Sequence, residues 1–527
     1  MKRVLVSDSM AAEVVEILNN TPGIKVDVKT NLKPEELKEI IKDYDALIVR
    51  SSTKVTTEII EAAAKLSAIG RAGAGVDNID IPAASKRGIV VMNTPGGNTV
   101  TTAEHAIAMM LSLARRIPQA TASMKAGKWE KSKFMGNEYC NKTLGIIGLG
   151  RVGAIVADRA QGLKMSVIAH DPFIAPDVAE KMGIPLVTLD EIYASADFIT
   201  VHPALSKETK NMIDAKALAK MKKGVFIINC ARGGIINEKD LYDALVSGKV
   251  AGAAIDVFEE EPTKNMELIS LDNVICTPHL GASTDEAQTN VAIAIAQQIA
   301  AYFATGEIKG AVNFPSVSAE LMTVIRPYLD LAEKLGKLQA QLITGAIQQV
   351  NIEYSGEILN HNVAPITISL LKGLLEPILM ENVNYINAPV IAKERGIKIV
   401  ESKSSEMKDY TNMITLTVKT SKETSNTAGA LFGKHDPRIV RINEFSVEIV
   451  PEGNILAVSN DDQPGVIGNL GTTLGKNKVN IARLHLSRDA EAKRALVVLN
   501  TDSAATKDVL EKLRKLPHVI SIKPIKM

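Results

Sequence analysis

The chain has 527 residues, 46% of them hydrophobic and 23% charged, which is enough for several globular domains, each with its own core. The 61 Lys and Arg residues are balanced by 60 Asp and Glu residues, which excludes the strongly basic surface required to bind nucleic acid or an anionic membrane. Cys140, Cys230 and Cys276 lack CxxC spacing, so we expect neither a disulfide framework nor a metal site.

The first hundred residues alternate short apolar runs with helical patterns. The N-terminal run is too short for a secretory signal, and no later run reaches the about 20 apolar residues that span a bilayer, so we expect a cytoplasmic protein. Segments 3–7, 46–51 and 88–93 are rich in Val and Ile and predict strands. A long helix is expected over 99–116, and the threonines at its start suit capping.

A second alternating series lies between residues 143 and 279. Its apolar runs are TLGIIG, SVIAHD, DFITVH, VFIIN, AAIDVF and NVICTPH, and a long helix over 283–306 is predicted to end at Gly306. Strands that are apolar almost throughout and alternate with helices indicate a parallel sheet covered on both faces. The two series therefore predict an α/β protein with two doubly wound parallel-sheet domains.

The character of the sequence changes after the segment NFPSVS (313–318), which we interpret as a linker. Residues 319–450 combine helical patterns with the predicted strands VNIEYSG, MITLTVKT and INEFSVEIV, and so predict an α+β domain. Residues 453–527 follow the order β-α-β-β-α-β, with the first helix expected to begin at Pro464. That order of elements is ferredoxin-like.

The motif LGIIGLGRVG contains Gly148, Gly150 and Gly153 in GxGxxG spacing, and it closes a predicted strand and opens a predicted helix. Gly148 permits the tight turn, Gly150 lets the backbone approach a dinucleotide diphosphate, and Gly153 lets helix and strand pack closely. Asp171 ends the next strand, where its carboxylate would bind the adenosine ribose and repel a 2′-phosphate. The sequence therefore predicts NAD rather than NADP, with its diphosphate at the helix N-terminus.

Three strand ends of the second series carry residues suited to hydride-transfer chemistry. Arg232 follows VFIIN, Glu261 follows AAIDVF and His279 follows NVICT. Because the carboxyl ends of parallel strands share one edge of the sheet, we expect these side chains to meet there. Arg232 would hold a substrate carboxylate, His279 would exchange the hydroxyl proton, and Glu261 would orient the imidazole. Nothing nearby in the sequence neutralises Arg232, so its counter-ion would be the substrate.

With GLGRVG, NCARGG, FEEEP and TPHLGAST, the chain resembles the D-isomer-specific 2-hydroxyacid dehydrogenases, and RSSTKV, GRAGAGVDNID and VMNTPGGNT extend the resemblance over residues 1–313. The resemblance implies a Rossmann-type NAD-binding domain (99–284) inserted in a flavodoxin-like substrate-binding domain (1–98 and 285–313). Within the family the chain looks like the long-form members. These oxidise 3-phosphoglycerate to 3-phosphohydroxypyruvate with NAD, the first step of phosphorylated L-serine biosynthesis.

The resemblance also implies which residues surround each ligand. The substrate phosphate would lie near residues of the first domain, namely Arg50, Ser52, Thr53, Arg71 and Gly75. Besides the three glycines and Asp171, the cofactor would contact Arg151, Val152, Cys230, Asp256, Gly281 and Ala282. Lys131 and Lys133 resemble a basic segment that reaches the site of a neighbouring subunit. Pro203 departs from the family pattern, in which a threonine usually follows His202, and it has no N–H or hydroxyl to offer the cofactor.

The C-terminal region resembles the regulatory part of the long-form enzymes. Residues 319–450 resemble their intervening domain, and residues 453–527 resemble an ACT domain with its DxPGVIG turn. In that family serine binds between paired ACT domains and inhibits, which implies L-serine as effector and a homo-oligomer, expected to be a tetramer. The side chains of Asn460, Asp462 and Asn480 would hold the serine, together with the backbone of Gly465 and Val466.

Three other functions fit parts of the sequence. A reductase of glyoxylate or another small 2-oxo acid would share the catalytic trio, but it would need neither the phosphate-binding residues nor the ACT-like tail. A transcriptional corepressor or NAD-sensing scaffold would share the fold, but it would not need Arg232, Glu261 and His279 together. A free-standing amino-acid sensor would leave the first 313 residues without a purpose.

Overall fold

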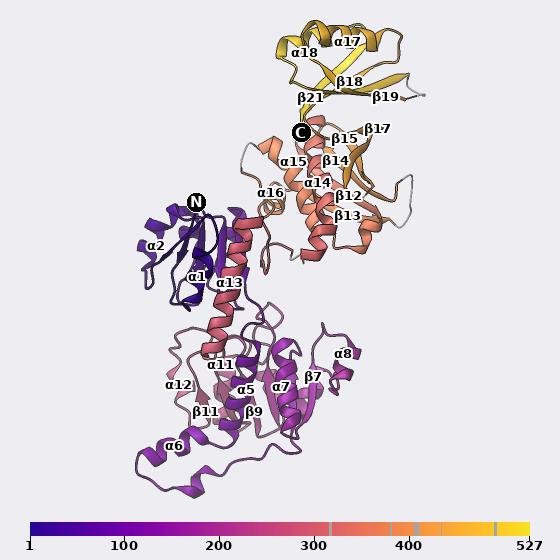
Figure 1. Cartoon of the computed structure of the whole chain (residues 1–527). Coiled ribbons are helices and arrows are strands. Elements are labelled where there is room, and N and C mark those ends of the chain that lie inside the picture. The colour runs from indigo at the N-terminus through magenta and orange to yellow at the C-terminus, as the bar shows by residue number, and fades with distance from the viewer. Residues whose placement is uncertain (316–318, 380–381, 405–409, 434, 490–492) are drawn as a thin grey trace.

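Four sheets follow one another along the chain, each with its own helices (Figure 1). This computed structural model describes residues 1–315, 319–379, 382–404, 410–433, 435–489 and 493–527, so the end of the predicted linker, 316–318, lies outside the described residues. We number four domains after the sheets. In the view of Figure 1 the second domain lies at the bottom, the first above it, and the third and fourth continue to the top.

The first domain has a five-stranded parallel sheet in the flavodoxin-like order β2-β1-β3-β4-β5. Its elements are β1 (Lys2–Val6), α1 (Glu13–Asn19), β2 (Ile24–Val28), α2 (Pro34–Ile40), η1 (Ile41–Asp43), β3 (Ala46–Val49), α3 (Thr57–Ala62), β4 (Ala68–Arg71), α4 (Ile81–Lys86) and β5 (Val90–Asn93). The sequence predicted β1, β3 and β5 but missed β2, a half-exposed edge strand, and β4, which has only four residues. Gly70 in β4 is needed because a Cβ there would lie 2.8 Å from Ile295 of the helix that crosses back over this sheet.

The second domain has a six-stranded parallel sheet in the order β11-β10-β9-β8-β6-β7. Its strands are β6 (Thr143–Ile147), β7 (Ser166–His170), β8 (Phe198–Val201), β9 (Val225–Asn229), β10 (Val250–Ile255) and β11 (Val274–Cys276), one for each predicted run. Its helices are α7 (Arg151–Gly162), α8 (Pro176–Lys181), α9 (Leu189–Ser195), α10 (Ala215–Lys220), α11 (Glu238–Val246) and α12 (Met266–Ile269). Beyond the edge strand β7, Leu186 pairs with Ala169 in an isolated parallel bridge. This bridge takes the place of the outermost strand in the Rossmann-type order. The predicted fold class is confirmed for both domains.

Two long helices, α5 (Thr99–Ala114) and α13 (Asp285–Thr305), belong to the segments that link the first two domains. The N-cap of α5 is Asn98 and no side chain caps it, so the predicted threonine cap was wrong. The hydroxyl of Thr284 does cap α13, and Gly306 ends it in the left-handed conformation (φ +74°), as predicted. After α5, an arm formed by α6 (Ile117–Lys125) and η2 (Lys131–Phe134) extends from the domain, and neither element buries a residue (Figure 1).

The third domain packs α14 (Ala319–Leu342) and α15 (Ala364–Leu379) against a mixed six-stranded sheet in the order β13-β12-β14-β15-β16-β17. Its other elements are β12 (Ile347–Gly356), η3 (Glu357–Asn360), α16 (Ala388–Glu394), β13 (Lys398–Ser404), β14 (Asn412–Thr420), β15 (Thr424–Phe432), β16 (Asp436–Ile442) and β17 (Phe445–Ile449). The predicted single strand INEFSVEIV was wrong, because a turn at Asn443 (φ +49°) divides it into the end of β16 and the whole of β17. The two helices cross closely at Gly336 and Gly373, where a Cβ on either glycine would lie 2.2 Å or less from a backbone oxygen of the other helix.

The fourth domain is ferredoxin-like, as predicted, with an antiparallel sheet in the order β19-β20-β18-β21. Its elements are β18 (Asn454–Asp461), α17 (Val466–Lys476), β19 (Ile481–Asp489), β20 (Arg494–Thr501), α18 (Lys507–Arg514) and β21 (Val519–Lys526). One sheet face packs on its own helices, whereas Ile455, Val498 and Ile525 on the other face join the apolar core of the third domain. The third and fourth domains therefore share one core.

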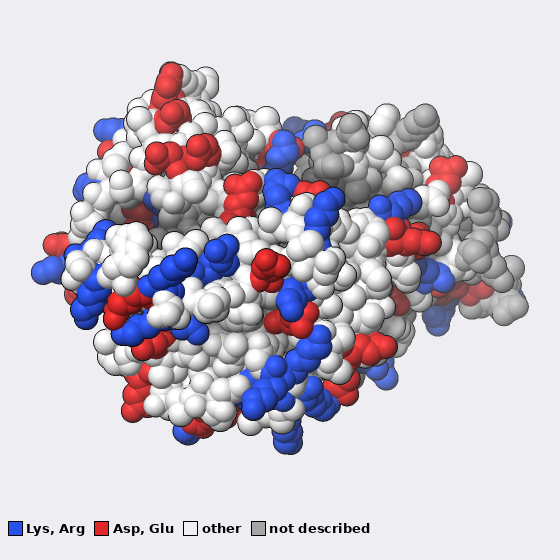
Figure 2. All heavy atoms as spheres, turned by 90° about the horizontal axis from the view of Figure 1, so that it is seen from below, with Lys and Arg blue, Asp and Glu red and all other residues white. Residues whose placement is uncertain are grey.

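The third domain contacts the first through a smaller joint. Ile386 is 7% exposed and packs in the core beneath the first sheet, and Asn384 donates a hydrogen bond to the carbonyl of Gly88 at 2.9 Å. Lys86 and Glu394 add an ion pair at 3.0 Å across the same joint. Charges of both signs are interspersed over the face seen in Figure 2, and no helix in the described ranges is long and apolar enough to cross a membrane.

Candidate active site

The glycine-rich turn between β6 and α7 has the geometry that its sequence predicts. Gly148 has a φ of +92°, and its N–H donates to the carbonyl of His170 at 2.8 Å. A Cβ on Gly153 would lie 2.1 Å from the carbonyl oxygen of Gly148, so only glycine permits this close packing of helix on strand. A Cβ on Gly150 would meet nothing within 4 Å, so the backbone is open to a ligand at the start of α7. This open helix N-terminus fits a diphosphate.

The residues around this turn lie at the carboxyl ends of β7 and β8. Asp171 accepts hydrogen bonds from the N–H groups of Leu149 and Phe173, each at 2.8 Å, so its carboxylate is fixed beside the turn, as an NAD ribose contact requires. Pro203 packs against the turn itself, because a Cβ on Gly148 would lie 2.8 Å from its nitrogen. Arg151 and Val152 are the first two residues of α7. The guanidinium of Arg151 donates a hydrogen bond to the carbonyl of Pro95 at 3.0 Å.

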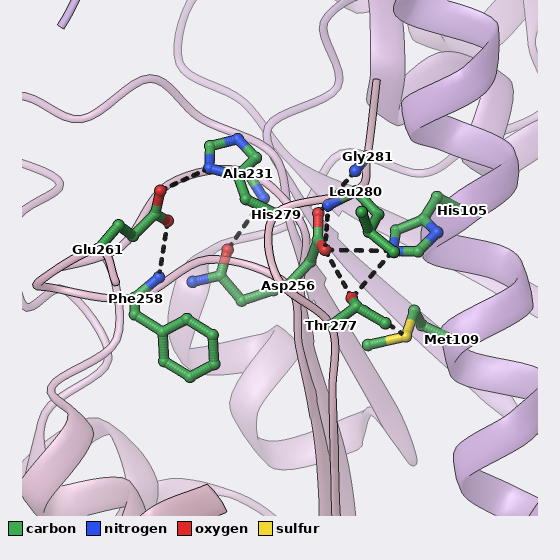
Figure 3. A network of polar contacts seen from close by, with 11 residues as sticks. His105, Met109, Ala231, Asp256, Phe258, Glu261, Thr277, His279, Leu280 and Gly281 are labelled. Atoms are coloured by element: carbon green, nitrogen blue, oxygen red, sulfur yellow. Dashed lines mark hydrogen bonds and ion pairs between the residues drawn. The ribbon is translucent and has the colours of Figure 1, made fainter. Parts of the chain in front are cut away.

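Glu261 and His279 form the predicted pair. Glu261 Oε2 lies 2.7 Å from His279 Nδ1, and Glu261 Oε1 accepts the N–H of Phe258 at 3.1 Å (Figure 3). The hydrogen bond with Glu261 raises the pKa of His279, although burial and Arg232 act in the opposite direction. Burial would raise the pKa of Glu261, but the bonds from His279 and Phe258 lower it on balance. The carboxylate occupies Nδ1, which leaves Nε2 as the nitrogen that can exchange a proton with a substrate.

A cavity of about 680 Å³ lies between the first and second domains, with this pair in its wall. Its lining comprises Arg50, Ser51, Lys54, Arg71, Ala72, Gly73, Asp77, Asn78 and Asn98, together with Phe258, Glu261, Pro262, Thr263, Pro278, His279, Ala282, Ser283, Ala287, Gln288 and Val291. Residues from both ends of the split first domain thus face the carboxyl edge of the second sheet. Such a crevice is where open α/β sheets bind their ligands.

Basic side chains concentrate on this cavity. Burial lowers the pKa of Arg71, and the nearby positive charges of Arg232 and Arg50 lower it further. The Nε of Arg71 is buried and has no hydrogen-bond partner in the described structure. Arg232 Nε lies 3.2 Å from Asp77, which corrects the expectation that only the substrate would pair with it. That partner comes from the first domain and its side chain is 74% exposed, so it can yield to a substrate carboxylate.

Only part of the predicted phosphate-binding set lies in the wall of this cavity. Arg50 and Arg71 line it, whereas Thr53 donates its hydroxyl to Asp8 at 2.8 Å and therefore holds the loop together. Ser52 and Gly75 are not in the cavity lining, and a Cβ on Gly75 would lie 2.4 Å from Arg232. The cavity is also lined by polar residues that were not predicted from the sequence, among them Ser51, Lys54, Asn78, Asn98 and Gln288. Ser51 and Lys54 lie within the RSSTKV motif (50–55), whereas Gln288 comes from α13 and no local pattern indicates it.

Asp256 lies behind the loop 277–281, which carries His279 and is called the catalytic loop below. Asp256 is 1% exposed. It accepts hydrogen bonds from the N–H groups of Leu280 and Gly281 at 2.7 and 2.8 Å and from the hydroxyl of Thr277 at 2.5 Å (Figure 3). Burial would raise its pKa, but hydrogen bonds from His105, Thr277 and Leu280 lower it on balance, so Asp256 is a carboxylate. Its observed role is to hold the loop, and a direct cofactor contact stays a prediction.

Cys230 is buried beside Asp256, and burial and that carboxylate raise the pKa of its thiol. The ligand atoms of His105, Cys230 and Asp256 lie within 4.8 Å of one another. A metal ion would require the thiolate, which this environment disfavours, and the carboxylate already accepts several protein donors. The cluster is therefore better explained as a wall of the predicted cofactor site.

The predicted effector residues of the fourth domain lie in two separate groups. Asn460 and Asp462 lie at the end of β18, next to Gly465 and Val466 at the start of α17. Asn460 is 2% exposed and its Oδ1 has no partner in the described structure, whereas Asp462 pairs with Arg488 at 3.1 Å. Asn480 precedes β19 at the other end of the sheet, where it donates to Asp502 at 2.7 Å. One copy of the domain does not bring all of them together.

Comparisons with known proteins match three segments of the chain and most of its length. Residues 107–281 match the model of the D-isomer specific 2-hydroxyacid dehydrogenase NAD-binding domain, 324–443 that of the D-3-phosphoglycerate dehydrogenase intervening domain, and 454–518 that of the ACT domain. The D-3-phosphoglycerate dehydrogenase of Archaeoglobus fulgidus is 45% identical over 98% of both chains, and that of Bacillus subtilis is 41% identical over 100% of this chain and 99% of its own. A crystal structure of D-lactate dehydrogenase from Aquifex aeolicus with NAD and lactic acid covers 60% of this chain and 100% of its own, with a TM-score of 0.53 and 27% identity.

Proposed function

Because the chain belongs to the D-isomer-specific 2-hydroxyacid dehydrogenase family, and within it to the D-3-phosphoglycerate dehydrogenases, we propose that it oxidises 3-phosphoglycerate to 3-phosphohydroxypyruvate with NAD. This reaction is the first step of phosphorylated L-serine biosynthesis. The observation that carries the proposal is the Glu261–His279 pair facing a cavity that is also lined by Arg71, whose buried Nε has no hydrogen-bond partner in the described structure. A proton-transfer group and an anion-binding group thus line one cavity.

Each part of the substrate has a partner in the cavity wall or directly beside it, where Arg232 pairs with the lining residue Asp77. The guanidinium of Arg232 can bind the substrate carboxylate through two parallel hydrogen bonds and displace Asp77. Arg50 and Arg71 line the wall contributed by the first domain, and their charges fit the phosphate. His279 Nε2 takes the proton of the C2 hydroxyl during oxidation, and Glu261 stabilises the imidazolium that results. In reduction the same nitrogen returns the proton.

The turn at Gly148, Gly150 and Gly153 fits NAD, with Asp171 placed for its ribose. NAD bound there supplies the acceptor for the hydride that leaves C2. The residues of the chain bind, orient and deprotonate the substrate in the cavity between the two domains.

We further propose the domain division 1–98 with 285–313 for substrate, 99–284 for NAD, 319–450 as intervening domain and 453–527 as ACT domain. The proposal includes L-serine as an inhibitor bound through Asn460, Asp462, Gly465, Val466 and Asn480. Two copies of the ACT domain are needed for such a site, which supports a homo-oligomer, and we propose a tetramer in the cytoplasm. Lys131 and Lys133, on the exposed arm, are the proposed contribution to a neighbouring subunit.

The test is NADH oxidation at 340 nm by purified protein with 3-phosphohydroxypyruvate, with and without L-serine. We expect turnover that serine suppresses. Turnover of glyoxylate or 2-oxoglutarate without turnover of the phosphorylated acid would contradict the phosphate subsite. Turnover that is indifferent to serine would contradict the effector assignment and leave the catalytic assignment standing, and no turnover of any of these acids would favour a non-catalytic, NAD-binding role.

A further inference from the structure

His105 lies beside the loop that carries His279, although no motif in the sequence marks it. It belongs to α5, the long helix near the junction of the first two domains, and its side chain is 20% exposed. Figure 3 shows its imidazole directed at Asp256 and Thr277, on the side of the loop opposite Glu261. His105 Nε2 lies 3.2 Å from the Thr277 hydroxyl and 3.3 Å from Asp256 Oδ1.

The position of one proton fixes the role of the His105 imidazole. The hydroxyl of Thr277 has a single hydrogen, and its shortest contact is Asp256 Oδ1 at 2.5 Å. Because that hydrogen is donated to the carboxylate, the Thr277 oxygen faces His105 as an acceptor. Asp256 is an acceptor as well. Nε2 of His105 therefore carries a hydrogen and donates it toward both oxygens.

Asp256 holds the catalytic loop by accepting hydrogen bonds from the backbone N–H groups of the loop. Its carboxylate accepts the N–H groups of Leu280 and Gly281, and its backbone carbonyl accepts the N–H of His279 at 2.9 Å. His279 has a φ of +55°, a left-handed conformation that is unfavourable for a histidine and has to be stabilised by its surroundings. The hydroxyl of Thr277, the N–H of Leu280 and Nε2 of His105 all approach Oδ1 of this carboxylate, whereas the N–H of Gly281 donates to Oδ2.

We propose that His105 is a positioning residue for proton transfer, because its Nε2–H is directed at both Asp256 Oδ1 and Thr277 and thereby helps to keep His279 in its strained conformation against Glu261. The inference rests on the proposed function, in which His279 exchanges the substrate proton. His105 contacts the loop from behind and does not line the substrate cavity. Without it, a buried carboxylate loses one donor, and the loop can relax away from the geometry that hydride transfer requires.

The test compares His105→Leu with His105→Gln in the full-length protein. Leucine keeps the bulk but donates no hydrogen bond, whereas the amide nitrogen of glutamine can reach the position of Nε2. We expect His105→Leu to lower kcat for the reduction of 3-phosphohydroxypyruvate by about 10- to 100-fold. KM should stay within about twofold, because the substrate-binding arginines are untouched. His105→Gln should restore most of kcat.

Two further measurements separate positioning from a general effect on folding. With NADH deuterated at the transferred position, the isotope effect on kcat should be larger for His105→Leu than for the wild type, because hydride transfer becomes slower relative to product release. Glu104→Gln, an exposed neighbour on α5, is the matched control and should change neither kcat nor the isotope effect. Thermal unfolding of each variant reports folding directly.

The outcomes are distinct. An active wild type with an equally active His105→Leu variant would overturn the proposal, and so would a loss of kcat that glutamine does not restore and that parallels a fall in Tm. A wild type that does not reduce 3-phosphohydroxypyruvate would contradict the proposed function instead. The same variants would then be compared on the 2-oxo acid that the wild type does reduce, where an unchanged kcat for His105→Leu would overturn the positioning role.

Discussion

The active-site candidates and the effector-site candidates differ in how one chain brings them together. Arg232, Glu261 and His279 follow β9, β10 and β11, which are adjacent parallel strands, so all three residues arrive at one edge of one sheet. Asn460 ends β18 and Asn480 precedes β19, and both strands are antiparallel to β20, which lies between them. The two asparagines therefore lie at opposite ends of the sheet, about 20 Å apart along the strands.

This difference indicates how many chains each site requires. One chain places the Glu261–His279 pair in the wall of a cavity lined by arginines, whereas it holds the proposed effector residues in two separate groups. A second ACT domain turned by 180° beside the first would place the Asn480 end of one next to the Asn460 end of the other. The catalytic trio is thus predicted to come from one chain, to which a neighbour adds Lys131 and Lys133, whereas the serine-binding residues themselves are predicted to come from two chains.

The largest expected effect is that of His279→Asn, which keeps the size of the side chain but cannot exchange a proton. Loss of a general acid–base should lower kcat by about 10²- to 10⁴-fold in both directions. The measurement is steady-state kinetics of NADH oxidation and NAD reduction, with NAD affinity measured separately by titration. A kcat within tenfold of the wild type would show that another group moves the proton. It would contradict the assignment of His279 as the acid–base of the active site.

Arg232→Lys is expected to follow, because lysine keeps the charge but loses the planar pair of donors. Hydrogen bonds to charged groups contribute about 1.5–3 kcal/mol each, so loss of one should lower kcat/KM by about 10- to 100-fold. Asp77→Asn is the matched control, since Asp77 is the partner of Arg232 in the structure. If Asp77→Asn is as damaging as Arg232→Lys, the arginine serves the contact between the domains rather than the substrate.

Glu261→Gln should have a smaller effect on rate, about tenfold, and a diagnostic effect on pH dependence. The hydrogen bond and charge of Glu261 raise the pKa of His279, so the glutamine variant should have a lower pKa at that imidazole. Oxidation requires neutral His279 and increases as pH rises through this pKa, and the increase should move to lower pH. Reduction requires protonated His279, and its decline with rising pH should move in the same direction. Profiles of kcat/KM that do not move would separate Glu261 from His279 in function.

The same comparison explains how much could be predicted from the sequence. The catalytic trio and the cofactor turn were predictable because strand ends of a parallel sheet share an edge, so position in the chain implies position in space. Gln288 was not predictable, because α13 begins at Asp285, far along the chain from the end of β5 at Asn93, and no local pattern records its return to the first domain. His105 and Asp77 were missed for a related reason, since their partners Asp256 and Arg232 lie in distant segments. Short or half-exposed strands such as β2 and β4 lack the apolar runs that marked the others.

Substitutions in the ACT domain are expected to change turnover least. They test most directly whether the effector site, unlike the active site, needs two chains. Asn460→Ala and Asn480→Ala should each abolish serine inhibition while kcat stays within about twofold of the wild type. Point substitutions are preferable to removal of the whole domain, because Ile455 and Val498 pack in the core of the third domain and their loss would expose it. Asp508→Asn, exposed on α18, is the control and should leave inhibition intact.

Mixed oligomers then decide whether the two asparagines act across subunits. If each effector site takes Asn460 from one chain and Asn480 from its neighbour, a pair of the two variant chains contains one site with both asparagines and one with neither. Oligomers assembled from both variants and purified through two different tags should therefore regain serine inhibition, although each variant alone is insensitive. If one chain supplied both asparagines to a site, every site in the mixture would remain incomplete and the mixture would stay insensitive. Recovery of inhibition would thus locate the effector site between two ACT domains, and its absence would return the site to a single domain whose residues must move together to bind.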